Sequence, residues 1–270
     1  MLLEDVSSIY LGETPVQRIY LADEIVWPKV PFEEQYLTIE PVSAGTLYFG
    51  KNRDEEIVYP DLDIEFSVDG GAWKSYSAST AEEKELSAGA KVRLRGTNSA
   101  YNFGGMHKGY YIGIFGSDYR MYGNVMSMIY GDNFSGQTAF TEPYAIAQLF
   151  EKHTTLQGGL IDAKNIILPA TTLTQGCYYC LFWEQPIPVS PKLIAENVPI
   201  YAYESMFLSC RYLREVYCIA TNLAYKATLD WFKYAEAGQG GCVFYKHPNM
   251  TWERSIDGVP SWMTIQDATI

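Results

Sequence analysis

An imperfect repeat in the second half of the chain constrains the fold more than any other feature. Residues of the same type recur at a constant offset of 25, where Leu168, Ala170, Leu173, Cys177, Tyr178 and Phe182 match Leu193, Ala195, Val198, Ala202, Tyr203 and Phe207. A period of about 20 to 30 residues with fixed apolar positions is typical of a solenoid, because each repeat buries its apolar face against the next. We expect each unit to supply a strand, at 166–168, 193–195 and 216–218, and then a short helical turn. Residues 141–270 are therefore predicted to form a short solenoid that ends in a C-terminal cap.

The preceding hundred or so residues follow a strand–turn–strand pattern. Leu62, Ile64 and Phe66 alternate with acidic residues, which predicts a strand with one buried and one acidic face. Further strands are expected at 37–40, 46–49, 92–94, 110–115, 119–122 and 125–130. Short strands with frequent turns and almost no helical periodicity indicate a β-sandwich, here of the immunoglobulin-like kind, over residues 36–135. The predicted fold class is mainly β with some α.

A second, shorter repeat opens the chain. Ile9-Tyr10-Leu11-Gly12 is followed at an offset of ten by Ile19-Tyr20-Leu21-Ala22, and both runs predict short strands or a hairpin. An isolated two-stranded ribbon is marginally stable in water, so we expect residues 1–30 to pack against the next domain or another protein. The candidate docking residues of this attachment hairpin are Ile9, Tyr10, Leu11, Ile19, Tyr20, Leu21 and Trp27.

Charge and composition exclude several classes of protein. Lys and Arg total 20 against 32 Asp and Glu, and a net charge of −12 argues against nucleic acid as a partner. With 47% hydrophobic residues the chain is expected to fold, and no apolar run reaches the about 18 residues that insertion into a membrane requires. The first residues lack the basic region of a signal peptide, so we expect folding in the cytosol unless a leader was removed.

Three motifs could carry chemistry, and a structural interpretation is favoured for each. Cys177-Tyr178-Tyr179-Cys180 has the spacing of a redox or zinc pair, but no second ligand pair follows, so both thiols are expected to pack inside the repeats. Ser67–Trp73 resembles a single Asp-box, whose Asp and Gly form a hairpin turn above a packed Trp. Asp61, Asp63 and Glu65 lie about 7 Å apart along one strand face. They could serve a glycosidase or hold calcium, but an exposed charged face is commoner.

We therefore predict no catalytic residue, no metal and no cofactor, and look to the aromatic residues for binding. Tyr suits recognition of sugars or proteins, although most tyrosines here should pack in the core. Tyr179 aligns with Glu204 one unit later, and Tyr212 stands beside Arg211 and Arg214. The candidate ligand surface therefore comprises Tyr179, Arg211, Tyr212 and Arg214.

Several segments resemble one family of surface proteins. Leu168-Pro169-Ala170-Thr171-Thr172-Leu173, Cys177-Tyr178 with Leu181-Phe182, and Met206-Phe207-Leu208-Ser209-Cys210 resemble BspA-like leucine-rich-repeat proteins. The ending, Tyr245–Met250 with Gly258–Trp262 and Gln266-Asp267, is similar to their cap, and 123–134 is similar to the segment before their repeats. The chain departs from the pattern at Trp183-Glu184-Gln185-Pro186, where the usual Gly-Cys is missing. Such proteins occur in Bacteroides-type gut bacteria and their phages, and the doubled N-terminal unit resembles the openings of phage virion and tail-associated proteins.

The resemblance implies a non-enzymatic structural or recognition role. The first hypothesis is a phage virion component, a head or tail fibre or a decoration protein, assembled in the host cytoplasm. Its N-terminus would dock on other virion proteins, its distal part would meet a host surface glycan or protein, and a homo-oligomer such as a trimer is expected. The alternative is a bacterial cell-surface adhesin, which needs an export signal. A carbohydrate-active enzyme is the third and least favoured hypothesis.

Overall fold

The computed structural model describes residues 31–52, 60–76, 84–105, 107–235 and 241–269, together with the backbone of four short strands nearer the N-terminus. The described residues are mainly β, with one short helix, α1 (Ser127–Tyr130), and the 3-10 turns η2 (Phe32–Glu34) and η3 (Gly131–Asn133). This confirms the prediction of a mainly β chain. Within the described residues, no helix combines the length and the apolar character that a membrane crossing demands.

Each copy of the N-terminal repeat forms its own antiparallel hairpin. Strand β1 (Tyr10–Leu11) pairs with β2 (Thr14–Pro15), and β3 (Ile19–Leu21) pairs with β4 (Glu24–Trp27). The two copies therefore do not pair with each other. Of the candidate docking residues, Tyr10 and Leu11 lie in β1, Ile19 to Leu21 form β3 and Trp27 ends β4. Ile9 lies outside the described residues.

Two sheets enclose the first part of the core, which we call the two-sheet part (residues 31–124). Its strands are β5 (Leu37–Pro41), β6 (Gly45–Lys51), β7 (Ile64–Val68), β8 (Lys74–Tyr76), β9 (Lys84–Leu86), β10 (Val92–Gly96), β11 (Tyr110–Phe115) and β12 (Tyr119–Asn124). One sheet has the order β12-β5-β10-β7-β8 before its extension described below, and the other has the order β11-β6-β9. Alternating residues of both sheets, such as Ile39, Leu94 and Ile112, lie fully buried in one common core.

The larger sheet continues into the repeats. Strand β13 (Leu160–Ile167) pairs in parallel with β12, with Tyr119 opposite Leu160 and Asn124 opposite Ile167. Core residues of the two-sheet part and of the repeats belong to a single buried cluster. Strand pairing therefore crosses the expected boundary between residues 135 and 141.

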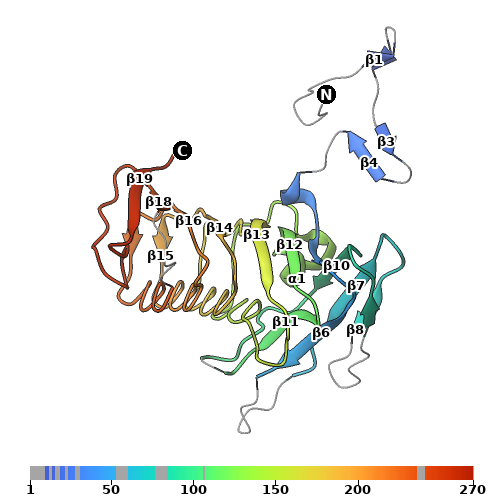
Figure 1. Cartoon of the computed structure of the whole chain (residues 1–270), viewed down its shortest axis with the longest axis horizontal. Helices are drawn as coiled ribbons and strands as arrows, with labels where there is room; N and C mark the ends of the chain where they lie inside the picture. The colour runs from blue at the N-terminus through green and yellow to red at the C-terminus, as the bar shows by residue number, and fades with distance from the viewer. Residues whose placement is uncertain are drawn as a thin grey trace.

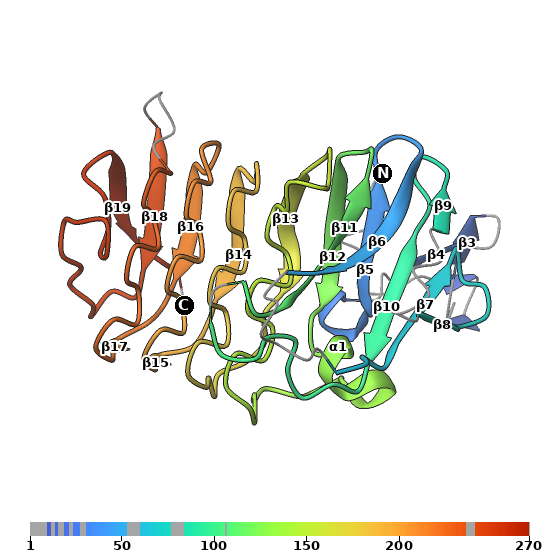
Figure 2. The same cartoon turned by 90° about the horizontal axis from the view of Figure 1, so that it is seen from below.

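From residue 144 the chain winds into what we call the repeat stack (residues 144–267), which includes β13. Four parallel strands form its sheet in the order β14 (Val189–Leu193), β16 (Glu215–Cys218), β18 (Cys242–Lys246) and β19 (Met263–Asp267). The short strands β15 (Asn197–Val198) and β17 (Asn222–Leu223) pair beside them. Figure 2 shows β13, β14, β16, β18 and β19 side by side along the molecule.

The opposite side of the repeat stack consists of turns (Figure 1). Alternate N–H groups donate within a unit, as from Tyr179 to the carbonyl of Gly176 at 3.0 Å, and to the next unit, as from Tyr178 to the carbonyl of Ala202 at 3.1 Å. The aromatic rings of successive units stack in the interior, where Phe182, Phe207 and Phe232 are 6.0 and 5.8 Å apart between ring centres. The offset of 25 seen in the sequence is thus an offset of one unit in space.

The segment 125–130 corrects the sequence analysis. It was predicted as a strand, but Ser127–Tyr130 form the helix α1. Val125, Met126 and Met128 are all fully buried, and a short run that is apolar on every side has no period that distinguishes a strand from a helix. Ser127 fixes α1 against the larger sheet, because its hydroxyl accepts the N–H of Leu37 and donates to the carbonyl of Leu94.

Candidate functional site

The predicted ligand surface is only partly at the surface. Tyr212 is 64% exposed, and its neighbours Arg211 and Arg214 are exposed as well. Tyr179 is only 7% exposed, so its expected surface position is wrong. It packs with Ala147 and Cys180 in a small cluster flanked by Tyr144 and Trp183, because the first turn segment of the repeat stack (residues 144–150) lies beside it. Tyr179 therefore does not form one surface with Tyr212.

The cysteines occupy the interior, as predicted. All five cysteines are buried, among them Cys177 and Cys180 of the CxxC motif. Burial raises the pKa of the Cys177 thiol to about 12, so it is protonated at neutral pH. A protonated, inaccessible thiol is a poor nucleophile and metal ligand, and this supports the packing interpretation of the motif.

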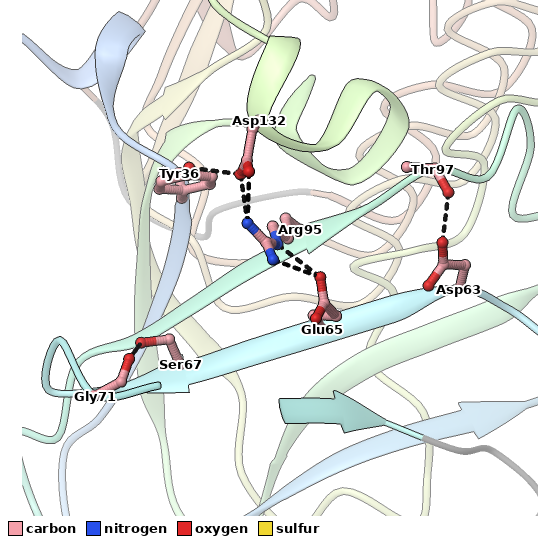
Figure 3. A network of polar contacts seen from close by, with 8 residues as sticks. All are labelled: Tyr36, Asp63, Glu65, Ser67, Gly71, Arg95, Thr97 and Asp132. Atoms are coloured by element: carbon pink, nitrogen blue, oxygen red, sulfur yellow. Dashed lines mark hydrogen bonds and ion pairs between the residues drawn. The ribbon is translucent and has the colours of Figure 1, made fainter. Parts of the chain in front are cut away.

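Figure 3 shows a polar network on the outer face of the larger sheet. Arg95 forms ion pairs with Glu65 at 2.7 Å and Asp132 at 2.6 Å, and the Tyr36 hydroxyl donates to Asp132 at 2.7 Å. Hydrogen bonds from Tyr36 and Arg95 hold the pKa of Asp132 below its usual range. The Trp73 ring lies 4.2 Å from the Arg95 guanidinium. The network links the start of β5, the β7–β8 hairpin, β10 and η3, so its role is to fix these elements together.

Two of the three predicted carboxylates, those of Asp63 and Glu65, already have partners within the protein. Glu65 is held by Arg95, and Asp63 accepts the Thr97 hydroxyl at 2.6 Å. Asp61 lies apart from both, at the groove described below. The structure therefore does not bring the three predicted carboxylates together on one target.

The Asp-box segment forms the expected hairpin turn between β7 and β8. Asp69 and Gly70 both have positive φ, at 48° and 77°, and the Gly71 N–H donates to the Val68 carbonyl at 2.9 Å. The Asp69 carboxylate accepts the backbone N–H of Lys91 at 2.8 Å, which ties the turn to β10. The antiparallel pairing of β7 with β8 around this turn confirms the predicted hairpin.

A buried carboxyl group lies where the two-sheet part meets the repeat stack. Glu151 is 4% exposed and accepts hydrogen bonds from the Asn52 amide at 2.9 Å and the Gln148 amide at 2.7 Å. The Gln148 oxygen in turn accepts the Asn102 amide at 2.8 Å. Burial is the main cause that raises the pKa of Glu151, to about 7, and the nearby Glu184 contributes in the same direction. The chain of amides holds the two parts together.

An open groove of about 630 Å³, the junction groove, lies between the two-sheet part and the first turns of the repeat stack. Three segments line it: 60–62 before β7, 98–104 after β10, and 142–144 with Gln175 from the turns. Its apolar lining comes from Pro60, Leu62, Ala100, Phe103 and Pro143, and its polar lining from Asp61, Asn98, Ser99, Asn102, Glu142, Tyr144 and Gln175.

Internal hydrogen bonds fix the wall of the junction groove. The Asn98 side chain accepts the Asp63 N–H at 2.9 Å and donates to the Asp63 carbonyl at 2.7 Å and to Tyr101 at 2.9 Å. The Tyr101 hydroxyl donates to the Met128 carbonyl at 2.7 Å. The Asn102 oxygen accepts the N–H groups of Gly104 and Gly105. These bonds tie the described part of the loop that carries Phe103 to Asp63 and α1.

Sequence reasoning missed this groove. Among its lining residues, the sequence pattern identifies Asp61 as a strand-face carboxylate and Leu62 as a strand residue, and neither as part of a groove. The groove forms where the first turn segment packs against loops of the two-sheet part. No local sequence motif predicts such a junction. Comparison of the chain with protein-family models, with curated proteins and with solved structures returned no match.

Proposed function

We propose that this chain is a non-enzymatic structural and recognition protein of a virus particle, a fibre or decoration protein. Its N-terminal hairpins dock on other virion proteins, and the body beyond them faces the host surface. In this proposal the two-sheet part is an immunoglobulin-like sandwich and the repeat stack is a leucine-rich-repeat-like solenoid.

One observation carries the proposal: the parallel pairing of β12 with β13 joins two kinds of fold into one elongated body. In Figure 1 the small hairpins stand away from the body on the side of the two-sheet part, whereas β19 lies at the opposite end. A rigid body with a small element at one end suits a protein that attaches at that end and presents the rest. Separate domains on a flexible linker would present no fixed surface.

The repeating side chains support the solenoid part of the proposal. Phe182, Phe207 and Phe232 occupy equivalent interior places at the offset of 25, as do Cys177, Ala202 and Ala227. Each unit contributes a strand to one side and a run of turns to the other, which is the general plan of such repeats.

Fractionation tests the proposal. Particles and outer membranes from cultures that produce the chain are separated by density, and peptides of the chain are quantified by mass spectrometry. We expect the chain to sediment with particles at a fixed copy number. Recovery from the outer membrane of uninfected cells would instead support the alternative of a bacterial surface adhesin.

Solution mass tests the expected homo-oligomer. Virus fibres act as oligomers, and we propose a trimer for this chain. Light scattering should give a mass of about three times the 30.5 kDa chain. A strictly monomeric chain would argue against the proposal of a fibre and favour that of a decoration protein.

A further inference from the structure

We propose that the junction groove binds a neutral oligosaccharide. The inference rests on the proposed function, since it assigns a ligand class to the surface that would meet the host. It places recognition at the junction of the two parts, away from Tyr212 and the arginines beside it. With about 630 Å³ the groove lies within the about 300 to 1,000 Å³ usual for small-ligand sites.

The first argument is preorganisation. The hydrogen bonds of Asn98 and Asn102 go to protein groups around the groove, namely Asp63, the loop N–H groups and Gln148, so these side chains shape the wall and leave recognition to other groups. The hydroxyl of Tyr101 anchors the same loop to α1 through the Met128 carbonyl. A wall that is already ordered loses little conformational entropy when a ligand binds.

The second argument is the chemistry of the groups that remain. The carboxylates of Asp61 and Glu142 line the groove and have no side-chain partner among the described residues. An ionised carboxylate is an acceptor only, so it calls for a ligand with several donors, such as adjacent sugar hydroxyls. The Phe103 side chain, 37% exposed, and the Tyr144 ring supply the apolar faces on which the C–H face of a sugar ring can stack.

The third argument is charge. Neither Lys nor Arg is among the described residues that line the groove, whereas two carboxylates are. A sialylated, uronic or phosphorylated ligand would meet like charge without a cation to offset it. The groove therefore favours neutral sugars over acidic ones.

A basic peptide would also meet the two carboxylates, but the backbone of the wall does not suit it. An extended peptide gains much of its affinity from hydrogen bonds to free main-chain groups. The N–H groups of Tyr101, Phe103 and Tyr144 are already paired, with the carbonyls of Ala145, Lys108 and Gln175. A sugar is recognised through side chains and ring faces, which are what the groove offers.

Binding of the full chain to an array of neutral, sialylated and sulfated oligosaccharides and of lysine-rich peptides tests the inference. We expect retention of neutral oligosaccharides, with an affinity that changes less than about twofold between about 50 and 500 mM NaCl. Preference for acidic glycans, preference for basic peptides with strong salt dependence, or no binding to neutral oligosaccharides would each overturn the inference.

Matched variants then locate the site with the best neutral oligosaccharide. Phe103→Ala and the double substitution Asp61→Asn with Glu142→Gln should each weaken binding about tenfold or more, because they remove the stacking face and the charged acceptors. The controls Phe115→Ala and Glu196→Gln alter an exposed ring and an exposed carboxylate outside the groove and should change affinity less than about twofold. The amide variants keep the shape of the acids, so their folding is expected to match the parent.

Equal affinity of the groove variants and the control variants would show that the junction groove is not the binding site. This failure is distinguishable from failure of the proposed function. A chain absent from purified particles would refute the virion assignment while leaving the sugar affinity of the purified protein unchanged. A chain present in particles whose groove variants bind normally would refute only the groove.

Discussion

At the scale of single residues, the turns of the repeat stack are built from an unusual backbone conformation. Positive φ recurs every fourth residue at non-glycine positions, at Tyr201, Ser205 and Ser209 in one unit and at Lys226, Asp230 and Tyr234 in the next. This conformation costs roughly 1 to 2 kcal/mol for a residue with a Cβ. Hydrogen bonds between units hold it, as from the Ser205 N–H to the Leu229 carbonyl at 2.9 Å.

Replacing one strained residue by glycine should therefore cost nothing. Tyr234 is 68% exposed with φ of 59°, and we expect Tyr234→Gly to leave the free energy of unfolding unchanged or to raise it by up to about 1 kcal/mol. Tyr212 is similarly exposed without positive φ, so Tyr212→Gly should lower it by about 0.5 to 1 kcal/mol. Urea unfolding measures both, and equal losses for the two variants would contradict the strain argument.

The buried Glu151 predicts a pH dependence of stability. Its pKa is raised from 4.5 to about 7 in the folded chain, so the folded state holds a proton that the unfolded state has released between these values. The contribution of Glu151 to the free energy of unfolding is fully present below about pH 4.5. It is lost as the pH rises through about 7, and the total loss is roughly 3 kcal/mol.

Glu151→Gln removes this titration. The difference in free energy of unfolding, variant minus parent, should increase by up to about 3 kcal/mol as the pH rises from about 4.5 to 7. This increase does not depend on the difference at low pH. Urea unfolding at a series of pH values gives both curves, and the exposed Glu196→Gln serves as control. Parallel curves for the Glu151 variant and the parent would show that Glu151 does not titrate in this range.

At the scale of elements, most strands could be predicted and their partners could not. Alternation is a local signal, so the strands around Ile39, Ile64 and Leu94 follow from the sequence. The pairing of β12 with β13 joins residues about 40 positions apart and leaves no local trace. The same holds for the junction groove, which three distant segments assemble, and for Tyr179, whose burial depends on a neighbouring unit.

The stacked rings make each unit depend on its neighbours. Phe207 lies between Phe182 and Phe232 with nearly parallel rings, at interplanar angles of 5° and 13°, and is fully buried. Phe207→Ala should lower the free energy of unfolding by about 3 to 5 kcal/mol, because it opens a cavity in the middle of the stack. Phe115→Ala, at a 42% exposed ring, should cost less than about 1 kcal/mol, and similar losses for the two in thermal unfolding would contradict the arrangement.

At the scale of the whole molecule, the shared sheet joins the two parts, and we expect them to unfold cooperatively. Gly158 lies just before β13, and a Cβ there would clash with the backbone oxygen of Ser117, so alanine requires the backbone at the junction to shift. We expect Gly158→Ala to speed amide hydrogen exchange both in β5 and in β16, on opposite sides of the junction. Gly71→Ala, in the β7–β8 turn, is the control. Faster exchange on one side only would show that the parts are independent.

We propose that the N-terminal hairpins attach the chain and that the rest of the body faces outward. The most direct measurement is immunogold labelling of intact particles that carry the chain with an epitope tag after its last residue, with and without deletion of residues 1–30. The account predicts label on the full-length particles and none after the deletion, while the purified deletion variant keeps the melting temperature of the body. Undiminished label after the deletion, or a tag that stays inaccessible in intact full-length particles, would contradict it.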